Sequence, residues 1–595
     1  MNRNESKILD PNDLEFVLYD WLQVDELTSL PRYAEHSRET FDEVLDLTRK
    51  IAEEYFQPHS RTSDLDEPHL VDGSVRIVAG VKTALDAFAE AGLIGATMDE
   101  QVGGFQLPHV VYRAASMWLQ AANIGTSAYP LLTTAAANLI RAYAAPELVE
   151  RYLPPMADGR WFGTMNLSEP GVGSSLGDLD SVAQRQEDGT YRLRGEKMWI
   201  SGGDHELSEN IVHLVLARTG GAGTRGLSLL IVPKWLGEPG ALTQRNDVAL
   251  VGLNHKMGFR GTVNTALSYG SGAYPVGDGV GAVGYLIGEE GHGLTYMFHM
   301  MNEARLAVGA SAAALAVTGF LHAREYARHR VQGRDLAAKD PSLPPVPIIR
   351  HPDVRRMLLE SKAYAEGSIA LVLYTTRLLD LAQTGADSSA RANADLLLDV
   401  LTPIAKSWPS QWGVEADDLA IQIHGGSGYV RDFPVEQFYR DNRLNAIHEG
   451  THGIHALDLL GRKVRLADGA GFALLVDAMT ETARRADALG SDLAPLLAVR
   501  VARLEDITRA LWAGGDPVSA LVNASEYLEA AGDLVVAWLL LDQVLAVQGR
   551  TDPFAEGKRL TTRFFFLHVL PRADAQLDLL ASGDRMLADL DESLI

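Results

Sequence analysis

The 595-residue chain contains no cysteine. Disulfide bonds, thiolate metal sites and a cysteine nucleophile are therefore excluded, so any catalytic group must be a carboxylate, a histidine, a hydroxyl or a cofactor. The chain also lacks an excess of positive charge. Its formal net charge is −25, which argues against general nucleic-acid binding, because that binding needs clustered Lys and Arg to replace phosphate counterions. An anionic ligand is not excluded, since local arginines can hold phosphates on an acidic protein.

Long hydrophobic runs are absent as well. No uninterrupted apolar run approaches the roughly 20 residues that span a bilayer, and residues 1–11 are polar and charged, without the apolar centre of a signal peptide. We therefore expect no membrane span and a cytoplasmic location. With 46% hydrophobic and 22% charged residues, the chain can bury a large core. Its length suggests about three or four domains.

Hydrophobic periodicity divides the chain into four parts. Residues 1–160 show helical spacing, residues 161–285 contain short β-branched runs bounded by glycine, and residues 286–464 return to long helical patterns. Residues 465–595 form a further helical block. We predict a mainly α protein with a central β domain: an N-terminal helical domain with an extension, a middle β domain, a helical bundle and an additional C-terminal helical domain.

Prolines fall inside two segments of the predicted bundle. Pro403 and Pro409 lie within the helical pattern of residues 390–420, and a proline removes a backbone donor and clashes with the preceding turn. We therefore expect a kink or an interruption there. Four prolines between residues 341 and 347 exclude helix through residues 333–347, which we expect to form a loop.

Two stretches match G-x-G-x-x-G, at residues 221–226 and 279–284. A dinucleotide-binding fingerprint must be followed by a helix within a strand-helix-strand unit. The first stretch lies between two strand-like runs, residues 211–217 and 227–232, and this context predicts a hairpin connection. We therefore do not predict a nicotinamide-dinucleotide fold.

The pentapeptide His-Glu-Gly-Thr-His at residues 448–452 has two incompatible interpretations. Alone it fits H-E-x-x-H, in which two histidines one helical turn apart bind zinc and the glutamate is the general base. Gly450 argues against this interpretation, because glycine disfavours the helix interior that the motif requires. The other interpretation depends on the residues upstream and on motifs elsewhere in the chain.

Three segments carry a resemblance to a known family. Residues 168–174 read Ser-Glu-Pro-Gly-x-Gly-Ser, residues 197–201 read Lys-Met-Trp-Ile-Ser, and residues 440–451 read Arg-Asp-Asn-Arg-Leu-Asn-Ala-Ile-His-Glu-Gly-Thr. The first segment alone fits a simple turn, or a loop whose backbone N–H groups hold a flavin edge or a phosphate. Together, over about residues 80–463, the chain resembles the acyl-CoA dehydrogenase family. The extended N-terminus and the added C-terminal helices resemble its long, 3-methylmercaptopropionyl-CoA dehydrogenase-like subfamily.

The resemblance implies an FAD site and a homodimer. Trp199 would cover the isoalloxazine ring, and Ser201 would offer its hydroxyl near flavin N5 and O4. Arg330 would reach the FAD of a neighbouring subunit. Taken singly, Trp199 also fits a buried strand tryptophan, and Arg330 a solvated basic helix face. The full set of implied cofactor-binding residues is Met165, Leu167, Ser168, Ser174, Trp199, Ser201, Arg330, Gln422, Gly426 and Thr451.

The resemblance assigns catalysis to Glu449. A Cα–H next to a thioester is weakly acidic, so its removal needs a base of raised pKa and stabilisation of the developing enolate oxygen. Glu449 would abstract the α-proton, its backbone N–H and a flavin ribityl hydroxyl would hold the thioester oxygen, and flavin N5 would accept the β-hydride. The implied products are a trans-2-enoyl-CoA and reduced FAD, whose electrons pass to an electron-transfer flavoprotein. The implied substrate contacts are Ser174, Asn302, Arg305 and Gly450, and no metal is expected.

Two alternative functions stay open. An acyl-CoA oxidase also carries a C-terminal helical extension, and oxygen access is invisible in a sequence. A non-catalytic, nucleic-acid-binding relative should have a basic C-terminal domain, whereas residues 465–595 carry 12 Lys and Arg against 20 Asp and Glu. His448, His452 and Gly453 differ from the residues common in the family, and these differences concern the acyl pocket. We expect the additional C-terminal domain to replace contacts made by a second dimer in tetrameric relatives.

Overall fold

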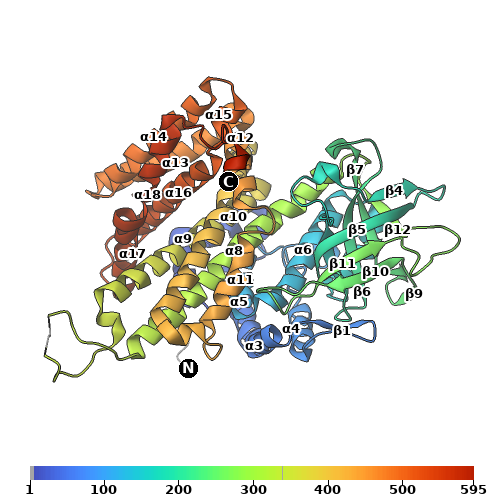
Figure 1. Cartoon of the computed structure of the whole chain (residues 1–595), viewed down its shortest axis with the longest axis horizontal. Coiled ribbons are helices and arrows are strands. Elements are labelled where there is room, and N and C mark those ends of the chain that lie inside the picture. The colour runs from blue at the N-terminus through green and yellow to red at the C-terminus, as the bar shows by residue number, and fades with distance from the viewer. Residues whose placement is uncertain (1–5, 338–339) are drawn as a thin grey trace. The chain divides into compact units, whose positions relative to one another are not determined.

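The computed structural model describes residues 6–337 and 340–595 and divides into two compact units. The first, here called the sheet unit, comprises Glu39–Leu107 and Trp118–Ala304. The second, here called the bundle unit, comprises the described part of residues 1–38 together with Pro108–Met117 and Arg305–Ile595. Figure 1 shows the helices and strands of both units, many of them labelled.

Most helices of the sheet unit precede its large sheet in the chain. They are α2 (Arg38–Ile51), α3 (Gln57–Leu65), α4 (Ala79–Glu90), α6 (Ile124–Tyr143) and α7 (Pro146–Ala157). Only Arg38, the first residue of α2, belongs to the other unit. Helix α5 (His109–Ala122) contributes residues to both units. Asn123 caps α6 by accepting a hydrogen bond from the backbone N–H of Thr126 at 3.1 Å, which satisfies one of the free donors of the first turn.

An eight-stranded, mainly antiparallel sheet forms the middle of the chain, in the order β10-β11-β5-β12-β7-β6-β3, with β4 paired to β5 and β6. Its strands are β3 (Trp161–Asn166), β4 (Val182–Arg185), β5 (Tyr191–Ser201), β6 (Asn210–Arg218), β7 (Leu227–Pro233), β10 (Val248–Leu253), β11 (Asn264–Tyr269) and β12 (Ala282–Ile287). The predicted hairpin is confirmed, because β6 and β7 are antiparallel and residues 219–226 connect them. Buried side chains of α6, α7, β3, β6 and β7 share one core cluster, so these helices pack on this part of the sheet (Figure 1).

The bundle unit is mainly helical. Its helices before residue 465 include α8 (Gly293–His329), whose first residues belong to the sheet unit, α9 (Pro352–Thr384), α10 (Ser388–His424), α11 (Val435–Asn445) and α12 (His452–Gly461). Helix α8 is long and apolar enough to cross a membrane, but 89% of its most apolar window is buried, so it is a core helix. The described residues of 333–347 form no helix, which confirms the predicted loop.

Helix α10 continues through Pro403 and Pro409, so the interruption that the prolines could have caused does not occur. A proline at 409 leaves the carbonyl of Ala405 without its helical donor. Gly309 of α8 lies against this oxygen: a Cβ added at Gly309 would be only 2.1 Å from it. The two helices therefore approach each other closely where the proline has freed an acceptor.

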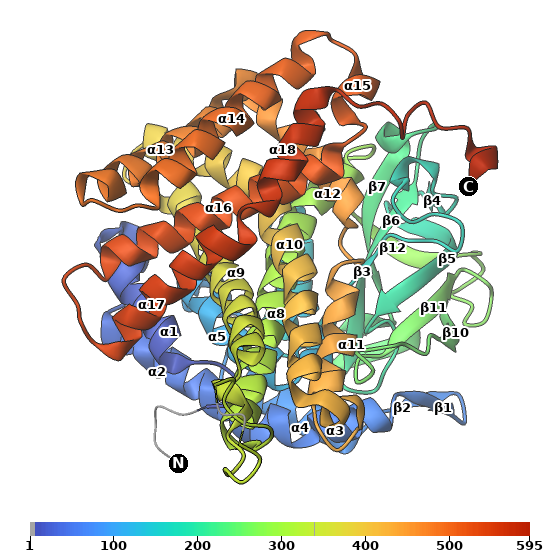
Figure 2. The ribbon, with the colours of Figure 1, turned by 60° about the vertical axis from the view of Figure 1, so that its left-hand side comes forward.

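Five further long helices follow the bundle and pack on it. They are α13 (Ala470–Ala488), α14 (Ala494–Ala513), α16 (Ala524–Ala546), α17 (Pro553–Phe564) and α18 (Arg572–Ser582). Helices α16 and α17 pack on α9 (Figure 2), and α13 packs on α10. Buried Asp533 of α16 joins the two layers, since it accepts hydrogen bonds from Trp408 Nε1 at 2.8 Å and from Arg572.

Candidate active site

Trp199 lies on a bulge of β5. In the pairing with β11, Lys197 faces Leu267 and Ile200 faces Thr265, so two residues of β5 oppose one residue of β11. Trp199 has a φ of +65°, and its side chain is 62% exposed. The interpretation as a buried strand tryptophan is therefore wrong. A bulge redirects a side chain, and a large aromatic ring that is exposed on a left-handed residue indicates a binding surface.

A buried ion pair joins this strand to the loop of residues 167–175. Lys197 Nζ donates to Glu169 Oε1 at 2.8 Å and to the carbonyls of Leu167 and Leu216. Glu169 also accepts from the backbone N–H groups of Asp180 at 2.7 Å and Ser181 at 3.1 Å. Burial lowers the pKa of Lys197 to about 8, while the Lys197 ammonium and these hydrogen bonds keep the pKa of Glu169 below its ordinary value despite burial. Neither Lys197 nor Glu169 was among the predicted site residues.

The predicted cofactor-binding residues of the sheet unit lie on two connected segments. The carbonyl of Ser168 accepts a hydrogen bond from the backbone N–H of Met198 at 3.0 Å, which holds the loop beside the bulge. Ser201 is the last residue of β5, and its Oγ accepts a hydrogen bond from Asn264 Nδ2 at 3.3 Å. All the predicted residues on these two segments are half-buried or exposed: Met165, Leu167, Ser168, Ser174, Trp199 and Ser201. Their hydroxyls and the exposed ring fit a flavin, which needs an aromatic face and hydrogen-bond donors at its edge.

Glu449 occupies a left-handed turn between α11 and α12. Its φ is +54° and that of Gly450 is +99°, so the chain leaves the helical conformation at both residues. A Cβ added at Gly450 would lie 2.8 Å from His455 Nε2, so both backbone and space require glycine at this position. Thr451 is the exposed N-cap residue of α12.

Two cations face the Glu449 carboxyl. Burial raises the pKa of Glu449 above its ordinary value, and the charges of Arg305 and Lys406 limit the rise. Arg305 is 4% exposed and pairs with Asp458 of α12 at 3.6 Å. Lys406 of α10 is fully buried, and burial lowers its pKa to about 7. A partly desolvated carboxyl whose pKa lies above the ordinary carboxylate value is a stronger base, so Glu449 can accept a proton from a weak carbon acid.

The geometry excludes the zinc interpretation of residues 448–452. Helix α11 ends at Asn445 and α12 begins at His452, so the two histidines are not one helical turn apart on a helix. His448 Nε2 lies 3.1 Å from Asn445 Oδ1, and His452 Nδ1 is hydrogen-bonded to Ser407 Oγ. Among the described residues, no group of three or more possible metal ligands occurs.

The remaining predicted residues lie on α8 and at the end of α10. Half-buried Asn302 precedes Arg305 on α8. Arg330 follows α8, while Gln422 and Gly426 lie at the end of α10, and all three are exposed. The two helix ends are tied together by Tyr326, whose ring stacks on His424 at 4.2 Å and whose hydroxyl lies 3.2 Å from Ser427 Oγ. An exposed set of polar groups is thus held on a rigid support.

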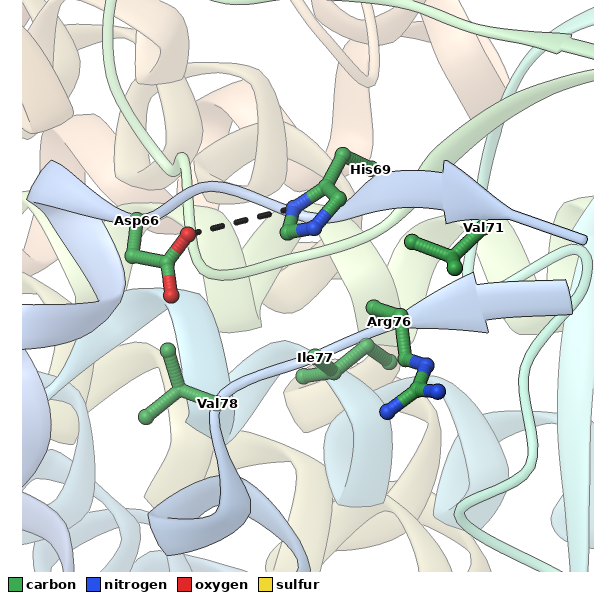
Figure 3. Close-up of a pocket in the computed structure, with 6 residues that line it drawn as sticks. All are labelled: Asp66, His69, Val71, Arg76, Ile77 and Val78. Atoms are coloured by element: carbon green, nitrogen blue, oxygen red, sulfur yellow. Dashed lines mark ion pairs between the residues drawn. The ribbon is translucent and has the colours of Figure 1, made fainter.

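A surface pocket beside the β1–β2 hairpin (His69–Val71 and Ser74–Arg76) is separate from these residues. Figure 3 shows that His69 points toward Asp66, with His69 Nδ1 3.8 Å from Asp66 Oδ1. Both side chains are more than half exposed, so this pair is weak. No residue predicted from the sequence for the site lines this pocket, which is formed by Asp66, His69, Val71, Arg76, Ile77 and Val78.

Lys406 and His455 are the site residues that sequence reasoning missed. Both contact the Glu449–Gly450 turn through hydrogen bonds to its carbonyls. A signal for Lys406 was present, because it is a lone cation among Pro403, Ile404, Ala405 and Trp408 in an apolar stretch of a long helix. His455 lies six residues after Glu449, and nothing in the sequence distinguishes it from a core histidine.

Models of one family match nearly the whole chain. The acyl-CoA dehydrogenase N-terminal, middle and C-terminal domain models match residues 38–160, 164–268 and 291–464, and the model described as acetyl-CoA dehydrogenase C-terminal like matches residues 475–591. The chain therefore belongs to the acyl-CoA dehydrogenase family, and the additional model accounts for its last helices.

Curated relatives match over the full length. The chain is 38% identical to the 3-methylmercaptopropionyl-CoA dehydrogenase of Ruegeria pomeroyi, with 97% of this chain and 98% of the relative covered. It is 32% identical to the broad-specificity linear acyl-CoA dehydrogenase FadE5 of Mycobacterium tuberculosis, with 98% of each chain covered. The protein is thus a long acyl-CoA dehydrogenase, a flavoprotein oxidoreductase that catalyses α,β-dehydrogenation of an acyl-CoA.

A solved structure supports the same fold. An acyl-CoA dehydrogenase of Bacillus anthracis, complexed with FAD, superposes with a TM-score of 0.71 at 19% identity, covering 99% of this chain and 93% of the other. The predicted fold class is confirmed: an N-terminal helical domain, a β-barrel middle domain and a helical domain, followed by an additional helical region.

Proposed function

We propose that Glu449 is the base that removes the α-proton of the acyl-CoA thioester during its conversion to the trans-2-enoyl-CoA. The observation that carries this proposal is the position of Glu449 on a left-handed turn, with its pKa raised by burial and with Arg305 and Lys406 facing it. A partly desolvated carboxylate is a stronger base than one in water, and the charges of Arg305 and Lys406 limit the rise of its pKa.

The backbone supports stabilisation of the developing oxyanion. Among the described hydrogen bonds, the N–H groups of Glu449, Gly450 and Thr451 have no acceptor. The N–H of Glu449 can therefore donate to the thioester oxygen as negative charge develops on it. Gly450 places no side chain in the way, and we assign Asn302, Arg305 and Ser174 to further contacts with the substrate.

We propose FAD as the cofactor of this site. Exposed Trp199 on its bulge, with Met165, Leu167, Ser168, Ser174 and Ser201 on the adjoining segments, would hold the flavin, and Thr451 would add a contact. The bound cofactor supplies a hydride acceptor at flavin N5 for the β-hydrogen. The resemblance also assigns Arg330, Gln422 and Gly426 to the FAD of a partner subunit in a homodimer. An electron-transfer flavoprotein is the proposed electron acceptor.

The substitution Glu449→Gln tests the assignment. The variant should retain FAD and bind acyl-CoA, but turnover should fall by roughly three orders of magnitude or more, because the only base is lost. The measurement is anaerobic bleaching of the flavin absorption band with butyryl-, octanoyl- and palmitoyl-CoA. In the wild type, kcat/KM should rise with pH through a limb that lies above the ordinary carboxylate pKa, since only the ionised form of Glu449 accepts the proton.

Glu415→Gln is a matched control. Burial also raises the pKa of Glu415, but its charged neighbours are Asp418, Glu360 and Arg572. This variant should keep wild-type turnover. Near-wild-type turnover of Glu449→Gln would contradict the proposal. Rapid reoxidation of the bleached enzyme in air would assign the protein to the oxidases.

A further inference from the structure

Both carbonyls of the Glu449–Gly450 turn are held by side chains from other positions of the bundle unit. His455 Nε2 of α12 lies 3.1 Å from the carbonyl oxygen of Glu449, and Lys406 Nζ of α10 donates to the carbonyl oxygen of Gly450. A carbonyl can only accept, so the Nε2 of neutral His455 carries the proton. The peptide bonds that follow Glu449 and Gly450 are trans, so each fixed carbonyl also fixes the opposite direction of the next N–H, that of Gly450 or Thr451.

Lys406 is an unusual residue for a structural core. It is fully buried in α10, and the Gly450 carbonyl is its only hydrogen-bond acceptor among the described residues. Burying an ammonium with a single neutral acceptor is unfavourable, so a core position of this kind would normally carry a hydrophobic residue. The acidic group that interacts with its charge is Glu449.

The other titratable groups around Glu449 do not replace this interaction. Arg305 of α8 faces Glu449 but is also paired with Asp458 of α12. The pKa values of His448, His452 and His455 are all lowered by burial, to about 4 or below, so these rings carry no charge at neutral pH. Lys406 is therefore the cation on α10 that faces the carboxyl and contacts the turn carrying it.

We propose that Lys406 is a positioning residue for the dehydrogenation: its Nζ holds the Gly450 carbonyl, and with it the turn that presents Glu449, while its ammonium faces the Glu449 carboxyl. This inference rests on the proposed role of Glu449 as the base. It predicts two separable effects. The hydrogen bond sets the geometry of proton removal, and the positive charge favours the carboxylate form of Glu449.

Two substitutions separate these effects. Lys406→Met removes both the donor and the charge, whereas Lys406→Gln removes the charge but retains an N–H donor for the Gly450 carbonyl. Loss of the cation should move the acid limb of the kcat/KM profile to higher pH in both variants, because the carboxylate loses a stabilising charge. Loss of the donor should lower the rate of proton removal at high pH by about tenfold in Lys406→Met, and this rate should recover to within about threefold in Lys406→Gln.

Proton removal can be measured apart from flavin reduction with 3,3-dimethylbutyryl-CoA. This thioester has α-hydrogens but no β-hydrogen, so dehydrogenation cannot follow. In D2O, Glu449 would take an α-proton to give the enolate, the carboxyl would exchange with solvent, and a deuteron would return to the α-carbon. Mass spectrometry of the thioester then reports the exchange rate of each holoenzyme as a function of pD. FAD content and Tm of each variant show that the fold is retained.

Lys463→Met is a matched control, because Lys463 is also buried in the bundle unit but pairs with Asp399. It should change Tm without moving the acid limb. If the acid limb stays at the wild-type pH in both Lys406→Met and Lys406→Gln, the electrostatic effect is overturned. If the wild type, Lys406→Met and Lys406→Gln exchange at equal rates at high pH, the positioning effect is overturned. If Glu449→Gln retains both exchange and turnover, the proposed function itself fails, which is a distinguishable result.

Discussion

At the scale of single residues, backbone conformation separates Trp199 from the rest of its strand. A left-handed φ is unfavourable for a residue with a Cβ by about 1–2 kcal/mol. The Trp199 ring does not offset this by core packing, since more than half of it is exposed. The strained conformation of Trp199 is thus better explained by a role of the ring in ligand binding than by a role in core packing.

Trp199→Gly should therefore leave the Tm of the apoprotein unchanged or higher, because glycine adopts this φ without strain. The same variant should bind FAD at least about tenfold more weakly, since the ring face is lost. Trp199→Phe should recover most of the affinity. Tm is measured by calorimetry and FAD affinity by fluorescence titration of the apoprotein.

Phe259 provides the control for this prediction. It has the same left-handed backbone, with a φ of +51°, but its side chain is 7% exposed. Phe259→Gly should lower the stability by about 3 kcal/mol or more, because burial outweighs the relief of strain. A similar loss of Tm in Trp199→Gly would show that the Trp199 ring serves packing.

At the scale of secondary-structure elements, helix α10 depends on its contact with α8. The oxygen freed by Pro409 lies against Gly309, where a Cβ would be 2.1 Å away. Gly309→Ala should separate the two helices and destabilise the protein by about 1–3 kcal/mol, because neither backbone can move alone in a packed core. The measurement is the Tm of the holoenzyme.

Gly557→Ala is the matched helix control. Gly557 lies inside α17, and the nearest atom to an added Cβ is Lys362 Nζ at 3.9 Å. Alanine should therefore stabilise the protein by up to about 1 kcal/mol through its higher helix propensity. A gain in Tm for Gly309→Ala as well would mean that the helices are not in close contact at the proline.

The same contact shows where prediction from the sequence ends. The β-branched runs predicted β6 and β7 correctly, because their pattern is local. Pro409 frees a carbonyl that lies against Gly309, about a hundred residues earlier in the chain, and no local rule includes such a neighbour. Predictions for a helix interior therefore leave out the packing of a second helix.

For the site as well, local motifs could be predicted from the sequence, whereas contacts between distant segments could not. Glu449, the loop of residues 168–174 and the segment of residues 197–201 could be predicted as site residues because each belongs to a continuous motif. The bulge at Trp199 depends on strand register, which alternation alone does not reveal. Lys406 contacts the Glu449 turn from another helix, so its role became visible only when the two segments were placed together.

At the scale of the whole molecule, α9 and α10 are covered by the additional C-terminal helices. If these helices replace the contacts of a second dimer, the protein should be a dimer of about 129 kDa, twice the chain mass of 64.5 kDa. Light scattering of the holoenzyme measures this mass. A tetramer would contradict the proposed role of the C-terminal domain.

The dimer also predicts that Arg330 acts on the cofactor of the other subunit. Among the described residues, its exposed guanidinium has no hydrogen-bond or ion-pair partner, so Arg330→Ala should change Tm little in the apoprotein. FAD affinity should nevertheless fall several-fold. Arg356→Ala is the control, because Arg356 is an exposed helix arginine that pairs with Asp353 and Glu360 of its own helix, and its loss should leave FAD affinity unchanged.

A mixed dimer distinguishes action between subunits from action within one. One subunit carries Trp199→Ala and the other carries Arg330→Ala, and each variant alone binds FAD weakly. If Arg330 reaches the partner's FAD, the mixed dimer contains one site with both residues intact, because the unchanged Trp199 of one subunit meets the unchanged Arg330 of the other. It should then bind one FAD per dimer with wild-type affinity. If Arg330 acted within its own subunit, both sites would be defective and no tight site would form.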